Sequence, residues 1–438
     1  MADKSCRENE SGDDSLSASP QSTVNTQPLN SWLQVSVKES SRRTTTSLKI
    51  QDSFVVYLVE TKVLDQLKIC PEWQEVPITV SGSDCASTSL VVVWRRYSEF
   101  DLLRDYLLDA FPSVVIPSLP GKRVVTPWQA AALDKSDPEF VEKRRVSLEQ
   151  FLKRLCCLPE ISSDPILLAF LKTDADWKKM VYSKQQLLKD SRLKALSAAY
   201  RIKRPNEKFE AIRRYANELE GHIGNLLKIR AKATEHLYGV HKIHVNYGRE
   251  FSEWSSLERQ DLADGLQKIG QYLDAFSEDI DASIESEEDF ADQLKEYHGY
   301  CDSLRHICVK QELLLLELQQ CESTLESKKS RRNNLSQGKR GLLDGLKVKM
   351  FGDGTPEQKE EKLKQLDEEI VEMEEKVKIA TEAIEKFESS ALANVEKFYA
   401  QKTSDITDVL ITHVVMSIDQ CKKSKASWVN VRQACQSM

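Results

Sequence analysis

The sequence predicts an α+β domain followed by an all-α domain in which three long helices form a coiled coil. Apolar, β-rich runs at residues 54–60 and 89–94, followed by helical periodicity, predict the first domain. Beyond residue 205 the strand signal disappears, and apolar residues recur at three- and four-residue spacing over very long charged stretches. We therefore expect two domains of different architecture in one chain.

The composition is ordinary for a protein that folds in water. The 438 residues are 30% charged and 40% hydrophobic, no apolar run reaches the ~18 residues of a membrane span, and the N-terminus lacks a signal-peptide core. Ten cysteines occur without a paired C-x-x-C pattern, so we expect free thiols and neither a metal nor another cofactor. The net charge of −7 argues weakly against nucleic-acid binding. We expect a cytosolic chain, at most attached to a membrane surface.

Changes in composition divide the chain into four segments. Residues 1–30 are polar and contain no aromatic residue, so we expect a disordered tail. Residues 31–175 form the α+β domain, residues 176–205 a linker, and residues 206–438 the coiled coil. Within the linker, residues 191–200 could form an amphipathic helix in the lipid headgroup zone or pack onto the first long helix.

Three strands and two helices are expected in the first domain. Alternation from Leu33 to Val37 predicts the first strand, and the two apolar runs predict the others, in a small antiparallel sheet. Ser98 with Asp101 three residues later resembles a capping box, which predicts a helix start. Pro138 at a first helical position predicts the start of a second helix.

The coiled coil should contain helices over residues 207–253, 257–332 and 357–435. Thr355 as a cap and Pro356 as the first helical residue mark the start of the third helix. Rods of this kind bury little surface against themselves, so we expect the chain to dimerise. Candidates for the contact are the leucines of a run in the second helix, although a run this dense could include core positions within the protomer. They are Leu313, Leu314, Leu316 and Leu318.

A group of basic residues suggests a binding site in the first domain. Arg95, Arg96 and Tyr97 end the third strand, and taken alone they could be a solvated edge with the tyrosine on the core. A proline-stiffened turn at residues 117–122 ends in a lysine, and residues 143–145 add KRR on the second helix. An anion with several phosphates or hydroxyls needs donors from separate elements, and a flat aromatic ring can pack against a sugar-like ring. This set suits a phosphoinositide headgroup.

Together these motifs resemble the PX domain. R-R-Y-S-E-F at residues 95–100, P-x-x-P-x-K at 117–122 and R-x-x-x-L-x-x-F at 144–151 occur in the order of that family. With the long helices behind them, the chain from about residue 31 resembles the PX-BAR sorting nexins. The resemblance implies a PX domain followed by an all-α, three-helix BAR domain.

The resemblance also implies roles for individual residues. Arg96 would bind the 3-phosphate of phosphatidylinositol 3-phosphate, and Tyr97 would stack under the inositol ring. Lys122 would hold the 1-phosphate, and Arg144 would bond the ring hydroxyls. The role of Arg95 is open, because the first arginine of such a pair can point away and make structural contacts.

Two further regions could contact a membrane. Val124, Val125 and Trp128 could enter the bilayer beside the headgroup or pack against the second helix. Residues 328–349 are strongly basic, with Asp344 as the single acid, and on a concave dimeric rod they would face anionic lipid, although such runs are often merely solvated. The basic residues of this tip include Lys328, Lys329, Arg331, Arg332, Lys339 and Arg340.

The resemblance implies a peripheral protein of the early endosome, on its cytosolic face, and not an enzyme. His236, His241 and His244 share a helix, but no nucleophile motif or phosphate-binding loop accompanies them. The chain would dimerise with another PX-BAR sorting nexin or with itself, sense or form tubules, and act in recycling, sorting and autophagy. The alternative is a coiled-coil scaffold whose PX domain binds protein instead of lipid.

Overall fold

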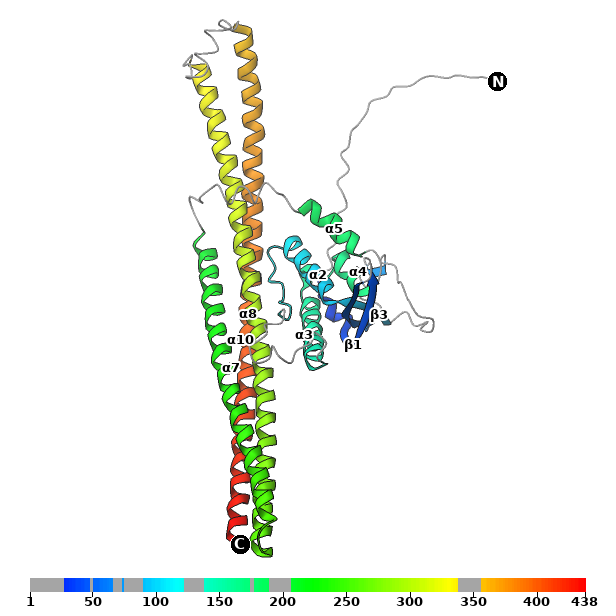
Figure 1. The fold of residues 1–438 in the computed structure, drawn as a ribbon. Helices are drawn as coiled ribbons and strands as arrows, with labels where there is room; N and C mark the ends of the chain where they lie inside the picture. Colours follow the sequence, from blue (N-terminus) through cyan, green and yellow to red (C-terminus); the bar gives the residue numbers. More distant parts are fainter. Residues whose placement is uncertain are drawn as a thin grey trace, which may run out of the picture.

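The computed structural model contains the predicted α+β domain and the predicted rod of three long helices, with the small domain against the middle of the rod (Figure 1). No helix in the part of the chain that the structure describes has the length and hydropathy of a membrane span. The described residues are 27–47, 50–65, 73–74, 90–121, 138–173, 177–188, 206–337 and 356–438.

The sheet has three antiparallel strands in the order β1-β2-β3, namely β1 (Leu33–Ser47), β2 (Ile50–Val63) and β3 (Leu90–Arg96). The three predicted strands are confirmed, but β1 and β2 run beyond β3 as a two-stranded ribbon in which Arg43 pairs with Phe54. The added part of β1 reads SSRRTTTS, which has no apolar alternation. Backbone pairing forms the ribbon, so hydrophobic periodicity did not reveal it.

Four helices accompany the sheet: α2 (Tyr97–Ala110), α3 (Pro138–Cys156), α4 (Pro165–Lys172) and α5 (Trp177–Leu188). The first two were predicted. The start of α4 repeats the cap-and-proline pattern of α3, because the Asp164 carboxylate accepts hydrogen bonds from two first-turn amides at 3.0 and 2.9 Å. The sequence therefore contained a signal for α4 that was not used.

The predicted cap of α2 is wrong by about two residues. Ser98 lies inside the helix, whose N-cap is Arg96, the last residue of β3. The Glu99 carboxylate accepts a hydrogen bond from the Arg96 backbone N–H at 2.8 Å, which satisfies one amide at the helix start. Strand β3 therefore passes into α2 without a loop, and this fixes the relative positions of Arg96 and Tyr97.

The core of the small domain lies between the sheet and its helices. Aromatic rings meet edge to face in its centre, with centroid distances of 5.1 Å both from Phe100 to Phe170 and from Phe170 to Trp177. Leu29 and Trp32 are fully buried in the same core, and Leu29 begins the short helix η1 (Leu29–Ser31). The folded domain therefore begins before residue 31, earlier than predicted, while residues 1–26 lie outside the described ranges.

Arg95 is part of this core, with 1% of its surface exposed. Its Nε and Nη2 atoms donate to the Phe170 carbonyl at 3.0 and 2.6 Å, and Nη2 also donates to the Thr173 carbonyl. The guanidinium lies 4.9 Å from the Phe170 ring centroid. Arg95 therefore satisfies carbonyls at the C-terminal end of α4, and the interpretation that it is a solvated strand edge is wrong.

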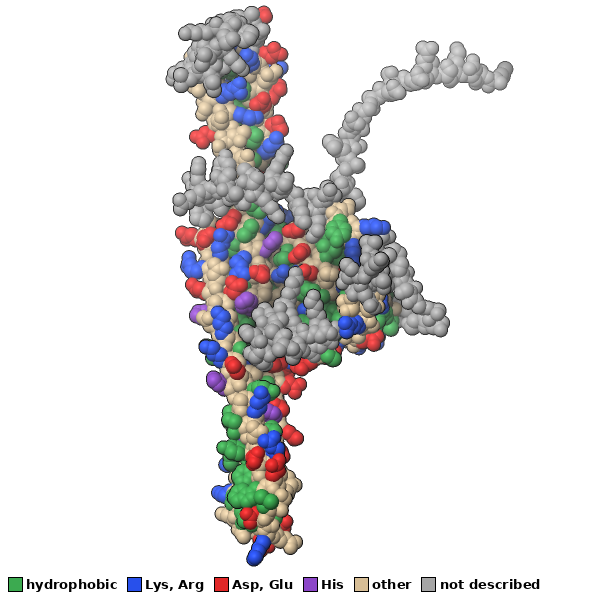
Figure 2. All heavy atoms as spheres, viewed as in Figure 1, with side chains coloured by type: hydrophobic (Ala, Val, Ile, Leu, Met, Phe, Trp, Pro, Cys, Tyr) green, Lys and Arg blue, Asp and Glu red, His purple; other side chains and the backbone are tan. Residues whose placement is uncertain are grey.

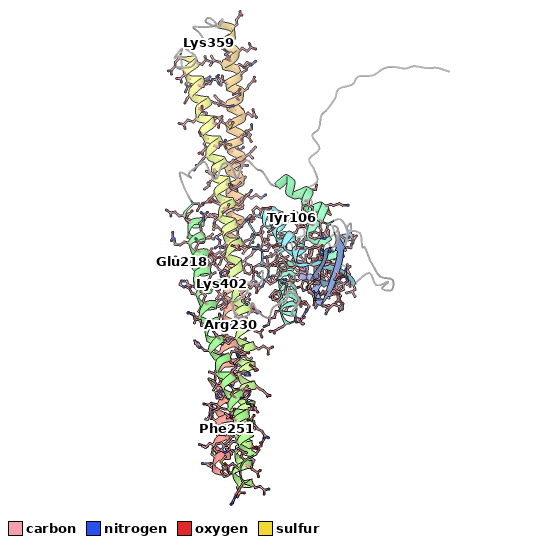
Figure 3. All side chains as sticks on the ribbon, viewed as in Figure 1. Tyr106, Glu218, Arg230, Phe251, Lys359 and Lys402 are labelled. Atoms are coloured by element: carbon pink, nitrogen blue, oxygen red, sulfur yellow. The ribbon has the colours of Figure 1, made fainter. Side chains whose placement is uncertain are left out.

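The rod consists of α7 (Glu207–Ser255), α8 (Gln260–Ser336) and α10 (Pro356–Gln436), close to the predicted bounds. At ~1.5 Å per residue, the 81 residues of α10 span roughly 120 Å. Figure 1 shows that α8 and α10 continue beyond the start of α7 as a two-helix arm. Side chains are packed along the rest of the rod, with Phe251 near the end opposite the arm (Figure 3).

We expect Arg95→Met to lower the free energy of unfolding of the PX-like domain by about 2 to 4 kcal/mol, because buried carbonyls lose a charged donor. Arg96→Met, the exposed neighbour, should change it by less than about 0.5 kcal/mol. Urea unfolding of both variants measures the difference. Equal stability of the two variants would contradict the structural role of Arg95.

Candidate lipid-headgroup site

The structure brings two of the four predicted headgroup residues, Tyr97 and Arg144, into contact, and Arg96 precedes Tyr97 in the chain. Arg96 ends β3, Tyr97 begins α2, and Arg144 projects from α3. The Arg144 guanidinium lies 4.4 Å from the centroid of the Tyr97 ring and 4.4 Å from that of the Phe140 ring. Two separate elements, α2 and α3, therefore supply the aromatic ring and an arginine beside it, a combination that suits an anionic ring compound.

Arg144 carries an unused hydrogen-bond donor. Its Nε atom is buried and has no hydrogen-bond partner among the described residues. The same guanidinium forms a hydrogen bond with the Tyr57 hydroxyl; burial raises the pKa of Tyr57, while the charge of Arg144 opposes that rise. Because buried donors are nearly always paired, the Nε atom indicates a position for an acceptor that the chain does not supply. Sequence reasoning did not identify Tyr57 as a support for this side chain.

Arg96 is exposed and lies over an aromatic ring of the ribbon. Its guanidinium carbon is 3.4 Å from the centroid of the Phe54 ring. No acidic side chain within the described ranges forms an ion pair with it. A phosphate would therefore compete only with a cation–π contact, which contributes about 0.5 to 1 kcal/mol at exposed sites.

The proline-stiffened turn reaches the site at Pro120. The Tyr97 hydroxyl donates a hydrogen bond to the Pro120 carbonyl at 2.7 Å, which fixes the ring of Tyr97 against the turn. The described chain continues to Gly121. Lys122, Val124, Val125 and Trp128 lie outside the described residues, so their contacts with phosphate or bilayer stay predictions.

The three neighbouring cations of α3 point in different directions, as successive residues of a helix do. Lys143 forms an ion pair with Glu288 of α8. Arg145 pairs with Glu142 at 2.6 Å and donates to the Val37 carbonyl of β1. Only Arg144 faces Tyr97, so the KRR motif joins the rod, the sheet and the candidate site.

The small domain is attached to the rod by hydrogen bonds from its proline-rich segment. The Ser118 hydroxyl donates to the Glu296 carbonyl at 2.8 Å, and the Ser303 hydroxyl of α8 donates to the Ile116 carbonyl at 2.6 Å. Val115 is buried in a cluster with rod residues from all three long helices. The segment that leads to the headgroup site is therefore part of the packing of the rod.

An ionic cluster joins α3 to the same region of the rod. Arg154, with a side chain 10% exposed, pairs with Asp405 of α10 at 2.7 Å and with Glu296 of α8. Burial raises the pKa of Glu296, although the charge of Arg154 opposes this effect. The carboxylates and the guanidinium thus compensate each other where water is largely excluded.

Comparisons with known proteins identify the domain and the family of this chain. A PX domain profile matches residues 86–174. Sorting nexin-4 of Mus musculus is 40% identical over 416 residues, covering 93% of this chain and 89% of the mouse protein. The chain belongs to the sorting nexin family. Sorting nexin-4 of Homo sapiens is 39% identical with the same coverage, and that of Saccharomyces cerevisiae is 25% identical, covering 78% of this chain and 82% of the yeast protein.

Among solved structures, the cryo-EM structure of the SNX-BAR Mvp1 tetramer covers 91% of this sorting nexin and 99% of that chain, with 17% identity and a TM-score of 0.49. The Imp2 F-BAR domain covers 50% of this chain and 78% of its own, with 13% identity and a TM-score of 0.31. The relatives confirm the predicted family, and the structure confirms the predicted fold class: the chain is a sorting nexin with a PX domain before a rod of three long helices.

The basic tip of this sorting nexin is less basic than its sequence suggests. Three of its four described cations pair with acids of α10, which lie too far along the chain for a local charge count to include. Arg331 has no such partner among the described residues, and Lys339 and Arg340 lie outside them. The pairs are Lys328 with Glu369, Lys329 with Glu374 and Arg332 with Asp367, at 2.9, 2.5 and 2.8 Å.

An apolar face lies on α7 and α10 of the rod. The two helices run side by side, since Tyr215 meets Tyr399 at 5.0 Å between ring centroids and His244 meets Trp428 at 6.1 Å. Hydrophobic side chains gather on the part of the rod away from the arm (Figure 2). The exposed hydrophobic side chains between these two contacts that share one side of the helix pair are here called the α7/α10 face. They are Leu226, Ile229, Val240, Ile243, Leu410, Ile411, Val414, Val415 and Ile418.

Of the leucine run expected at the dimer contact, one member is buried within the protomer. Leu316 is buried in α8, and Leu313, Leu314 and Leu318 are only partly exposed. The α7/α10 face is the better candidate for a contact with another chain.

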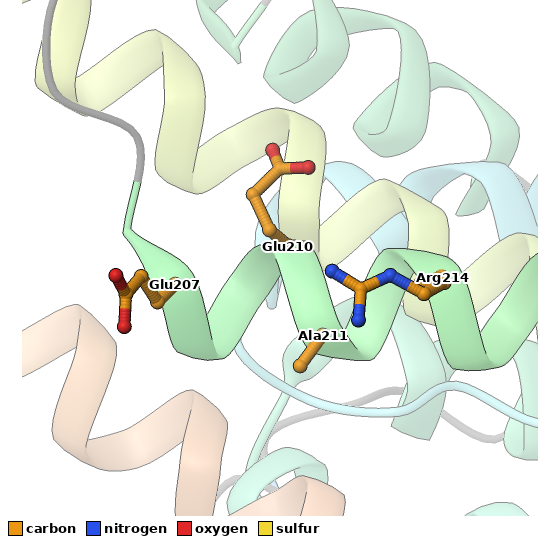
Figure 4. Close-up of a pocket in the computed structure, with 4 residues that line it drawn as sticks. All are labelled: Glu207, Glu210, Ala211 and Arg214. Atoms are coloured by element: carbon orange, nitrogen blue, oxygen red, sulfur yellow. The ribbon is translucent and has the colours of Figure 1, made fainter.

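A hollow of about 380 Å³ at the start of α7 does not suit an anionic headgroup. Glu207, Glu210, Ala211 and Arg214 line it (Figure 4), so two carboxylates oppose one guanidinium. Within the described ranges, no group of three or more His, Cys, Asp or Glu side chains is placed to hold a metal.

Proposed function

We propose that this sorting nexin is a non-enzymatic peripheral membrane protein that binds phosphatidylinositol 3-phosphate on the cytosolic face of early endosomes. The observation that carries the proposal is the buried Nε donor of Arg144, which lacks a partner beside the Tyr97 ring. The 3-phosphate would bind Arg96, the inositol ring would pack on Tyr97, and the ring hydroxyls would accept hydrogen bonds from Arg144. Lys122 would hold the 1-phosphate.

The rod would convert this single site into a membrane-bound pair. We propose that the α7/α10 face binds a second copy or another PX-BAR sorting nexin. Its exposed apolar side chains would be removed from water together in such a contact. Two headgroup sites on one frame act at high effective concentration, which adds a factor of ~10² or more in avidity. Such a dimer would sense or form tubules in endosomal recycling and sorting, with a role in autophagy.

The basic tip would add a weaker contact with anionic lipid. Its ion pairs with α10 are exposed, and exposed pairs contribute at most about 1 kcal/mol each, so a lipid surface can replace the acidic partners. Charge reversal of the lysines would also place like charges against Glu369 and Glu374. Neutral substitutions therefore separate lipid binding from the integrity of the arm.

We expect Arg144→Gln and Arg96→Gln each to abolish flotation with liposomes that contain phosphatidylinositol 3-phosphate, because phosphate charge or ring hydroxyls lose their donors. Arg43→Gln is the matched control. Arg43 is an exposed arginine of the β1–β2 ribbon, and its guanidinium carbon lies 4.7 Å from the centroid of the Trp94 ring of β3. It should float like the parent. Liposomes with unphosphorylated phosphatidylinositol report the contribution of charge alone.

Two outcomes distinguish the proposal from its alternative. A parent protein that does not discriminate between the two liposomes would favour a scaffold whose PX domain binds protein. A parent that discriminates, with Arg144→Gln and Arg96→Gln variants that still float, would place the headgroup elsewhere on the PX domain.

We expect Ile411→Glu with Val415→Glu to give a folded monomer, since charges cannot be buried in the α7/α10 face without a partner. Val371→Glu with Ile379→Glu is the control, because these side chains are at least as exposed on α10 but lie on the two-helix arm. Sedimentation velocity measures the association. If the monomer floats as tightly as the parent, bivalent attachment is excluded.

A further inference from the structure

The turn before Lys122 is held from two opposite sides. On one side, the Tyr97 hydroxyl donates to the Pro120 carbonyl at 2.7 Å. On the other, the Ser118 hydroxyl donates to the Glu296 carbonyl of α8 at 2.8 Å. A segment of a few residues therefore connects the ring of the candidate site directly to the backbone of the rod.

Gly299 lies where this turn touches α8. A Cβ atom added at residue 299 would lie 2.5 Å from the Ser118 Cβ and 2.9 Å from its Oγ. Real Cβ atoms do not approach other atoms so closely, so any side chain at this position must displace the turn. Glycine inside a helix is unfavourable by about 1 kcal/mol relative to alanine, and a close approach of another backbone segment is a physical reason for its presence.

The second element of the site rests on the same stretch of the rod. Helix α3, which carries Arg144, is held to α8 by Lys143 with Glu288 and by Arg154 with Glu296. Glu288 and Ser303 are 15 residues apart in one helix, a length of roughly 22 Å. Contacts with this one segment of α8 thus hold the elements that carry both the Tyr97 ring and the Arg144 guanidinium.

We infer that α8 sets the geometry of the headgroup site and that Gly299 is a positioning residue for it. Gly299 touches no lipid; it lets the turn lie close enough to α8 for Pro120 to hold Tyr97 beside Arg144. The inference rests on the proposed function, because it concerns the affinity of that same site. It follows that displacement of α8 changes headgroup affinity, and that headgroup binding in turn favours the attached arrangement of the PX domain.

The test is titration of the full chain with a soluble short-chain phosphatidylinositol 3-phosphate, which needs neither a bilayer nor avidity. Gly299→Ala should weaken binding by about three- to tenfold, a change of about 0.7 to 1.4 kcal/mol. Gly221→Ala in α7 is the matched control, because a Cβ there would meet no atom within 4 Å. It should bind like the parent.

A second substitution tests whether the effect passes through the turn. Ser118→Gly removes the atoms that Gly299→Ala would strike. The double variant should therefore bind as tightly as Ser118→Gly alone, although both single substitutions leave every proposed lipid contact in place.

The outcomes are distinct. If the parent does not bind the soluble headgroup, the proposed function fails at this site and the inference fails with it. If the parent binds and Gly299→Ala binds equally well, only the positioning role is overturned. The same conclusion follows if Gly299→Ala binds weakly but Ser118→Gly does not suppress the loss, since a general disturbance of α8 would then be the cause.

Discussion

The attachment of the PX domain to helix α8 is the contact on which the other features depend. A free PX domain would need only its own core, which is complete between the sheet and helices α2 to α5. In this chain, Val115 leaves that core for the rod, and Arg154 forms ion pairs with acids on two different long helices. Breaking the attachment would expose apolar surface and leave partly buried charges without partners, so it is held by both packing and electrostatics.

This attachment fixes the orientation of the proposed lipid site relative to the rod. A flexible tether between the PX domain and the rod would let each headgroup site bind lipid independently. The conformational entropy lost when that tether became ordered at the membrane would oppose binding. A fixed PX domain instead presents its site at one orientation relative to the rod. In the proposed dimer, two such sites would bind together only on a surface that both can reach, which makes binding sensitive to membrane shape.

Most of the architecture was predictable from the sequence because its signals are local. Long helical periodicity and the helix start at Pro356 predicted the rod, and the apolar runs predicted the strands. The different roles of Arg95 and Arg96 were not determined, although strand alternation places one side chain on each face of the sheet. Their roles became clear only with the carbonyls of Phe170 and Thr173, which lie more than seventy residues further along the chain.

We expect the PX domain and the rod to move as one rigid unit. Spin labels introduced as unnatural amino acids at Lys62 and Glu285 would measure it, since both side chains are exposed and ten native cysteines preclude thiol labelling. Pulsed electron resonance should give one narrow distance distribution that does not change when vesicles with phosphatidylinositol 3-phosphate are added. A broad distribution, or one that narrows only on the vesicles, would contradict the account.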